Sequence, residues 1–166
     1  MTGIIKVDTI QNNAGTTGLT IDSSGRVLTP ARPAFNVGFS SSGNLSLNDD
    51  TLIPFDNDSS NNCYDLGSNF NTTTSRFVAP VTGTYMMLLT VFINTSGSLS
   101  CQMKVNGSVL NNGADTMAGF KNDAGTSSHL NLILQLNATD YVEAFTRNGS
   151  YQVYKNHSFW SGALLG

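Results

Sequence analysis

The sequence predicts an all-β domain of the sandwich, barrel or jelly-roll kind. Polar and apolar residues alternate with period two over many short stretches, which is the pattern of half-buried strands. Turn dipeptides such as Asn106-Gly107, Asn112-Gly113 and Asn148-Gly149 separate these stretches. Good helix formers are scarce, while 16 of the 166 residues are glycine. Short strands divided by turns in this way indicate a sandwich, a barrel or a jelly roll.

Residues 1–31 are predicted to form a small unit of short strands. Apolar residues recur in three brief stretches, at 5–9, 19–21 and 26–28. Three strands of this size cannot bury a core by themselves. We therefore expect this unit to pair with copies of itself or to dock on another protein, and residues 32–166 to form the main domain.

The stretch from Thr84 to Asn94 is apolar on both of its faces. One face can fill the core, and the other then needs a second cover, for which a neighbouring copy of the chain is the natural candidate. A charged residue at Leu89 or Val91 should then abolish the assembly. The residues predicted to form the core and the interface between subunits are Tyr85, Met87, Leu89, Val91, Phe92, Trp160 and Leu164.

Two further strands complete the predicted sheets. Leucines alternate with polar residues such as His129 and Gln135 from Leu130 to Leu136, which indicates a half-buried antiparallel strand. The chain ends on the apolar stretch 159–166. We expect this stretch to be a final strand buried in the sheet.

Charge and hydropathy argue against two classes of partner. The net charge is −3, and the eight basic residues are scattered singly, whereas nucleic-acid binding favours clustered Lys and Arg. No run of about 18 or more apolar residues is present, so no membrane-spanning helix is expected. The stretch that carries Lys6 and Asp8 is too short and too charged for a secretory signal. The absence of such a signal argues against a secreted protein.

Patterns of catalysis and metal binding are weak. No metal-ligand spacing surrounds His129 or His157, and neither a nucleophile elbow nor a phosphate-binding loop occurs. We predict no enzymatic activity and no cofactor, apart from a candidate calcium site. Because calcium binds several oxygen ligands from flexible loops, the one acidic cluster is either that site or a set of solvated carboxylates. The cluster consists of Asp49, Asp50, Asp56 and Asp58.

The remaining candidates are two cysteines and two tyrosines. Cys101 stands in phase with apolar neighbours, which favours a buried thiol; a bridge to Cys63 is the alternative. Tyr151 and Tyr154 follow the turn at 148–149 and are the best candidates for exposed rings that stack on a sugar. The loops around 56–63, 111–128 and 147–156 would surround such a site.

The stretch from Asp65 to Tyr85 resembles the signature of C1q domains. The matching frame is Asp65-x4-Phe70-x6-Phe77-x5-Gly83-x-Tyr85, although Met87 stands where Phe is usual. Both ends of the domain sequence also resemble the family. Arg32-Pro-Ala-Phe35 resembles its first strand, and residues 158–165 resemble its S-x-F-x-G-x-L-L ending. The resemblance implies a C1q-like, homotrimeric jelly roll related to the tumour-necrosis-factor fold, with residues 32–166 as its head.

A second resemblance involves the N-terminus. Residues 5–12 and 19–27 resemble the leader of structural proteins from tailed phages, especially those of marine cyanobacteria. This resemblance implies that the leader attaches the chain to other virion proteins through Ile5, Val7, Ile10, Leu19, Ile21 and Val27.

Together, the two resemblances imply a virion structural protein made in the cytoplasm of a host bacterium. It would be a trimeric tail fibre, knob or capsid decoration whose head serves host-surface attachment. A lectin-like module that binds a receptor or glycan is one alternative, and a secreted C1q-like protein is another.

Overall fold

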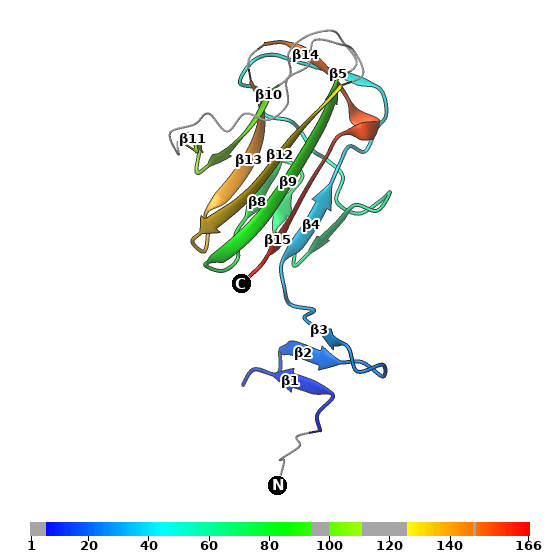
Figure 1. Cartoon of the computed structure of the whole chain (residues 1–166), viewed down its shortest axis with the longest axis vertical. Helices are drawn as coiled ribbons and strands as arrows, with labels where there is room; N and C mark the ends of the chain where they lie inside the picture. The colour runs from blue at the N-terminus through cyan, green and yellow to red at the C-terminus, as the bar shows by residue number, and fades with distance from the viewer. Residues whose placement is uncertain (1–5, 94–99, 111–125, 148) are drawn as a thin grey trace. The chain divides into compact units, whose positions relative to one another are not determined.

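A computed structural model describes residues 6–93, 100–110, 126–147 and 149–166 of the chain (Figure 1). The chain divides into two compact units, Met1–Arg32 and Pro33–Gly166. This boundary lies one residue beyond the expected one. Within the described ranges, no helix is long and apolar enough to cross a membrane.

The second unit is an all-β jelly-roll sandwich, which confirms the predicted fold class. The strands of its larger sheet are β4 (Ala34–Val37), β5 (Asn44–Leu47), β6 (Tyr64–Leu66), β9 (Gly83–Ile93), β12 (Thr126–Leu136), β14 (Tyr151–Tyr154) and β15 (Phe159–Leu164). The strands of its smaller sheet are β7 (Phe70–Asn71), β8 (Arg76–Val78), β10 (Ser100–Val105), β11 (Ser108–Val109) and β13 (Tyr141–Arg147). A single 3₁₀ turn in the described residues, η1 (Lys155–His157), joins β14 to β15.

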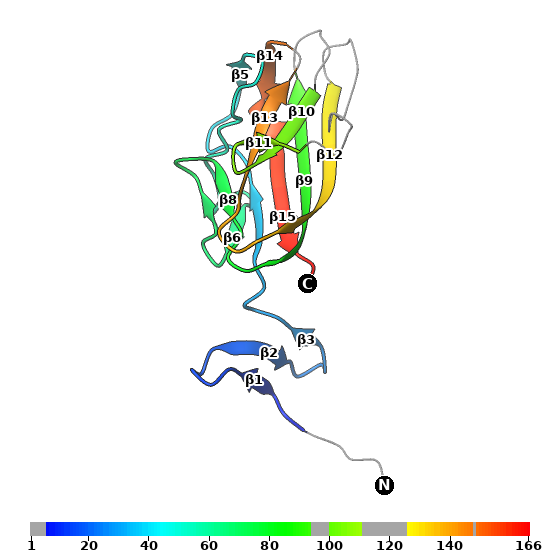
Figure 2. The same ribbon diagram turned by 90° about the vertical axis from the view of Figure 1, so that its left-hand side faces the viewer.

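The two sheets form two layers, which Figure 2 shows from the side. The larger sheet has the order β5-β14-β9-β15-β4-β6, with β12 also paired to β9, and the smaller sheet has the order β11-β10-β13-β8-β7. All of these pairings are antiparallel. Sheet neighbours such as β4 and β15 come from opposite ends of the domain sequence, as a jelly roll requires.

Strand β9 lies at the centre of the larger sheet because it pairs with β12 along one edge and with β15 along the other. Its alternating residues from Tyr85 to Ile93 are completely buried, while those between them are half-buried. An aromatic cluster packs beneath it, in which Phe35 stacks on Phe77 with ring centroids 4.8 Å apart and meets the edge of Trp160 at 5.2 Å. This cluster and the inward faces of both sheets form the core.

The first unit is a three-stranded antiparallel sheet of β1 (Thr9–Gln11), β2 (Thr17–Ile21) and β3 (Val27–Leu28). Two turns of the same construction join these strands. In the first, the side-chain oxygen of Asn12 accepts hydrogen bonds from two backbone N–H groups. Asp22 does the same in the second turn, ten residues later. Gly15 and Gly25 supply the positive φ that each turn requires.

Both cysteines are free. Cys101 is completely buried, which confirms its interpretation as a buried thiol and excludes the alternative bridge to Cys63. Burial raises the pKa of the Cys101 thiol to about 12.

Candidate functional site

One row of side chains across the outward face of the larger sheet is apolar from β12 to β6. Ile133 on β12 lies opposite Met86 on β9, and Met86 in turn lies opposite Ala163 on β15. Ile133 is 68% exposed and Phe159 is 44% exposed. At the far edge of the sheet, Leu66 and Tyr64 lie opposite Ala34 and Asn36 of β4, and both are exposed. We call this surface the outer face; its apolar members are Ala34, Tyr64, Leu66, Met86, Leu88, Phe92, Ile133, Phe159 and Ala163.

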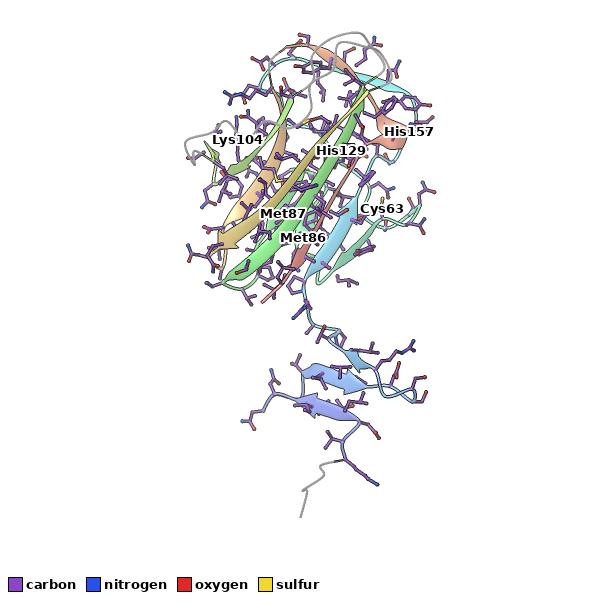
Figure 3. The ribbon with its side chains drawn as sticks, in the orientation of Figure 1. Cys63, Met86, Met87, Lys104, His129 and His157 are labelled. Atoms are coloured by element: carbon purple, nitrogen blue, oxygen red, sulfur yellow. The ribbon has the colours of Figure 1, made fainter. Side chains whose placement is uncertain are left out.

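The outer face contains no Asp, Glu, Lys or Arg among the described residues of β4, β6, β9, β12 and β15 that point outward. Its polar members are Ser, Thr, Asn, Gln and His. Figure 3 shows Met86 and His129 on this side of the head. An apolar patch that is depleted of charge is typical of the centre of a protein interface.

The outward face of the smaller sheet is different, because charged side chains cover its aromatic rings. The Lys104 ammonium lies 3.8 Å from the centroid of the Phe145 ring, and the Arg76 guanidinium lies 4.3 Å from that of Tyr141. Arg76 also donates a hydrogen bond of 2.8 Å to the buried carboxylate of Glu143. Charged groups therefore give the outward face of the smaller sheet a surface suited to water, whereas the outer face has no such groups.

The structure separates the residues predicted for the core and the subunit interface. Five of them point inward and are completely buried within the single chain, so they belong to the core: Tyr85, Met87, Leu89, Val91 and Trp160. Leu164 is partly buried against this core. Phe92 alone of the predicted set lies on the outer face, where its ring contacts those of Tyr154 and His157. A charge at Leu89 or Val91 would therefore disrupt the fold of the subunit and would not report on assembly.

Sequence reasoning missed Ile133, Phe159, Tyr64 and Leu66 as members of the outer face. Ile133 had a usable signal, because it is an apolar residue at a polar position of the leucine strand. The strand β6 is too short for its phase to be recognised from the pattern.

The four aspartates of the acidic cluster do not share a site. Asp50 makes an ion pair of 2.7 Å with Lys104 and accepts a hydrogen bond from Gln102. Asp56 instead accepts two hydrogen bonds from Ser40. Among the described residues, no group of three or more His, Cys, Asp or Glu side chains could hold a metal ion. The geometry therefore gives no support to calcium binding by Asp49, Asp50, Asp56 and Asp58.

The prediction of Tyr151 as an exposed, ligand-facing ring is wrong. Its side chain is only 4% exposed, and its hydroxyl donates a 2.6 Å hydrogen bond to the carbonyl of Arg147. Val153 on the same strand is also buried, so Tyr151 and Val153 lie on the side of β14 that faces the core. Tyr154 takes the outward phase and packs edge to face on His157 with ring centroids 4.9 Å apart. Of the three loops expected around a ligand, residues 111–125 lie outside the described part of the chain.

The predicted attachment residues occupy the first unit. Ile10 and Val27 are 53% and 60% exposed, and Val7 is also exposed. Leu19 and Ile21 on β2 are partly buried, and Ile5 lies outside the described residues. The first unit thus exposes apolar side chains on its surface.

The sequence of the second unit identifies its family. The C1q domain family model matches residues 34–165. The chain belongs to the C1q domain family. No curated protein sequence matches the chain.

Solved structures agree on the fold of this C1q domain. The globular domain of zebrafish complement 1qA superposes with a TM-score of 0.60 at 18% identity, over 81% of this chain and 98% of that one. The Eiger TNF of S. frugiperda gives a TM-score of 0.58 at 14% identity, over 82% and 94% of the two chains. Murine APRIL also gives 0.58, at 11% identity over 81% and 99%. These likenesses establish the C1q/TNF-like jelly roll.

Proposed function

We propose that this chain is a structural protein of a phage virion, namely a homotrimeric fibre or knob. In this proposal the C1q domain is the head, which contacts the host surface, and residues 1–32 attach it to other virion proteins. A secreted C1q-like protein is the second candidate. The family match covers only the head and does not distinguish a virion protein from a secreted one.

The uncharged outer face is the observation that carries the assembly part of the proposal. A monomer would expose Ile133, Phe159, Leu66 and Tyr64 on one sheet surface, which favours association through the hydrophobic effect. The charged outward face of the smaller sheet would remain in water. The C1q resemblance supports three copies, and closed cyclic symmetry would cover the outer face of each copy.

Light scattering on the full chain tests the trimer. We expect three times the 17.7 kDa chain mass. Ile133→Glu should reduce this mass to that of one chain while the circular dichroism of the fold persists, because Ile133 is exposed within a single subunit. Val78→Glu is the matched control; Val78 is 38% exposed on the smaller sheet, and its variant should stay trimeric. A monomeric wild-type chain, or a trimeric Ile133→Glu variant, contradicts the assigned interface.

Immunogold labelling of particles purified from a phage lysate tests the virion part separately. The resemblance of residues 5–12 and 19–27 to phage leaders supports labelled particles and loss of the label when residues 1–32 are deleted. Free trimers with unlabelled particles would favour the second candidate.

A further inference from the structure

A polar cleft opens beside the outer face of the C1q domain. It lies between the segment that follows β4, the loop that precedes β6, and η1 with the start of β15. Its volume is about 580 Å³, and sites for small ligands typically measure about 300–1,000 Å³. Cys63 lies in its wall, and Figure 3 shows Cys63 on the same side of the head as His157.

Hydrogen bonds hold the segment after β4 in place from two sides. The Asp56 carboxylate accepts the backbone N–H and the hydroxyl of Ser40, each at 2.7 Å. The Lys155 ammonium donates to the Ser41 hydroxyl at 2.7 Å. The walls are therefore ordered before any ligand arrives, which lowers the entropic cost of binding.

Two side-chain amides in the cleft, those of Asn156 and Asn61, have donor or acceptor groups that are not used within the described residues. The side-chain oxygen of Asn156 accepts the N–H of Gly43 at 3.0 Å, while its NH₂ group has no partner within the described residues. The Asn61 amide likewise makes no hydrogen bond inside the described ranges. An amide can donate to one hydroxyl and accept from its neighbour. Beside these amides, the half-buried ring of Phe39 lies in the wall of the cleft, packed on Phe55 with ring centroids 5.0 Å apart.

The composition of the lining selects the class of ligand. Among the described residues that line the cleft, Lys155 is the one charged side chain, whereas phosphate-rich ligands require clustered cations. Phe39 and Phe159 are its aromatic members, and Asn and Ser provide most of the remainder. Pockets for apolar ligands are instead lined mainly by hydrophobic side chains. Amides, hydroxyls and a flat ring together match a compact ligand rich in neighbouring hydroxyl groups.

We propose that this cleft binds a neutral saccharide. The inference rests on the proposed function, to which it adds the chemical class of the host-surface ligand. Its amide hydrogen bonds come from Asn61 and Asn156, and Phe39 provides the aromatic surface.

The test screens the full-length chain against an array of neutral hexose and N-acetylhexosamine oligosaccharides, with sulfated and uronic oligosaccharides beside them. Titration calorimetry then measures the strongest neutral hit. Asn156→Asp retains the acceptor for Gly43 and removes the NH₂ donor, so we expect binding that is about tenfold weaker or lost. Asn61→Asp should act similarly. Asn13→Asp is the matched control, because Asn13 is an exposed amide of the first unit.

Light scattering on the same samples separates this proposal from the trimer. A chain of trimeric mass that binds no neutral saccharide overturns the cleft assignment and leaves the assembly intact. Binding that survives both Asn156→Asp and Asn61→Asp, or binding to anionic oligosaccharides only, also overturns it. Protection of Cys63 from iodoacetamide by the bound saccharide supports it, because Cys63 lines the cleft.

Discussion

Glu143 is a nearly buried carboxylate that depends on one cation. Its side chain lies on the outward side of β13, and Arg76 covers it with a 2.8 Å hydrogen bond while resting on the Tyr141 ring. The hydrogen bond to Glu143 raises the pKa of the Arg76 guanidinium. Removal of the cation would leave a desolvated acceptor, which is more costly than loss of an exposed ion pair.

We therefore expect Arg76→Met to lower the free energy of unfolding by about 2 kcal/mol. Replacing Glu143 with Met as well should recover part of that loss, because no unpaired charge remains. Urea denaturation at one fixed protein concentration measures both effects. Equal stability of the single and double variants would contradict this account.

The Cys101 thiol gives the domain a specific sensitivity to alkali. Its pKa is raised to about 12 in the fold by burial, compared with 9.0 for an unperturbed thiol. The buried thiol remains protonated where the unfolded chain has already lost the proton. Its stabilising contribution is therefore fully present below pH 9.0 and is lost as the pH rises from 9.0 toward 12.

The comparison of wild type with Cys101→Ala isolates this effect, because the other alkaline groups are common to both. Between pH 8.5 and 10.5 the wild-type chain should lose more stability than the variant, by on the order of 2 kcal/mol. Urea unfolding at the two pH values measures the difference. Parallel losses in the two proteins would exclude Cys101 as the cause.

At the scale of elements, β15 contains a glycine whose missing side chain makes room for the core. A Cβ atom on Gly162 would lie 2.5 Å from Cε1 of Phe35 and 2.7 Å from the sulfur of Met87. Phe35 cannot move aside easily, because it stacks on Phe77 and meets Trp160. Close packing against Phe35 and Met87 thus explains why glycine occupies this position of the S-x-F-x-G-x-L-L ending.

Gly162→Ala should destabilise the domain by about 1–3 kcal/mol through overpacking. Gly166→Ala is the control, since a Cβ atom there meets nothing within 4 Å. Thermal unfolding of both variants at equal concentration checks the expectation. An unchanged melting temperature for Gly162→Ala would mean that the aromatic cluster is looser than described.

The alternation of apolar residues predicted β9 and its buried face, because β9 is long and its period is regular. The same reasoning failed for Tyr151, where β14 is four residues long and a one-residue change of phase turns a ring from solvent to core. It also failed for the acidic cluster, because aspartates that are close in sequence bond to different elements. The polar cleft could not be predicted, since its walls come from three segments that are separate in the sequence, at 36–42, 57–63 and 155–159.

At the scale of the whole molecule, the two units differ in how they are stabilised. All of the buried apolar side chains identified in the described residues lie between Phe35 and Trp160. The first unit has only a partly buried β2 and is otherwise exposed. The C1q domain therefore carries its own core, and residues 1–32 do not.

Expression of residues 33–166 alone should yield a folded domain with the strand content of the full chain. A peptide of residues 1–32 should give the circular dichroism of an unfolded chain. Amide hydrogen exchange compares the two, with strong protection expected in interior strands of the C1q domain such as β9 and β15, and none in the peptide. An unfolded 33–166 fragment would show that the first unit contributes to the core.

The two turns of the first unit share one hydrogen-bond pattern, which bears on how the length of the unit can change. Asn12 and Asp22 begin the same five-residue turn, ten residues apart. Each ten-residue step adds one strand, and neighbouring strands are spaced by about 4.8 Å. One more ten-residue step inserted after β3 would therefore extend the sheet by a single strand width. Because neighbouring strands are antiparallel, it would also reverse the side of the sheet from which the chain leaves.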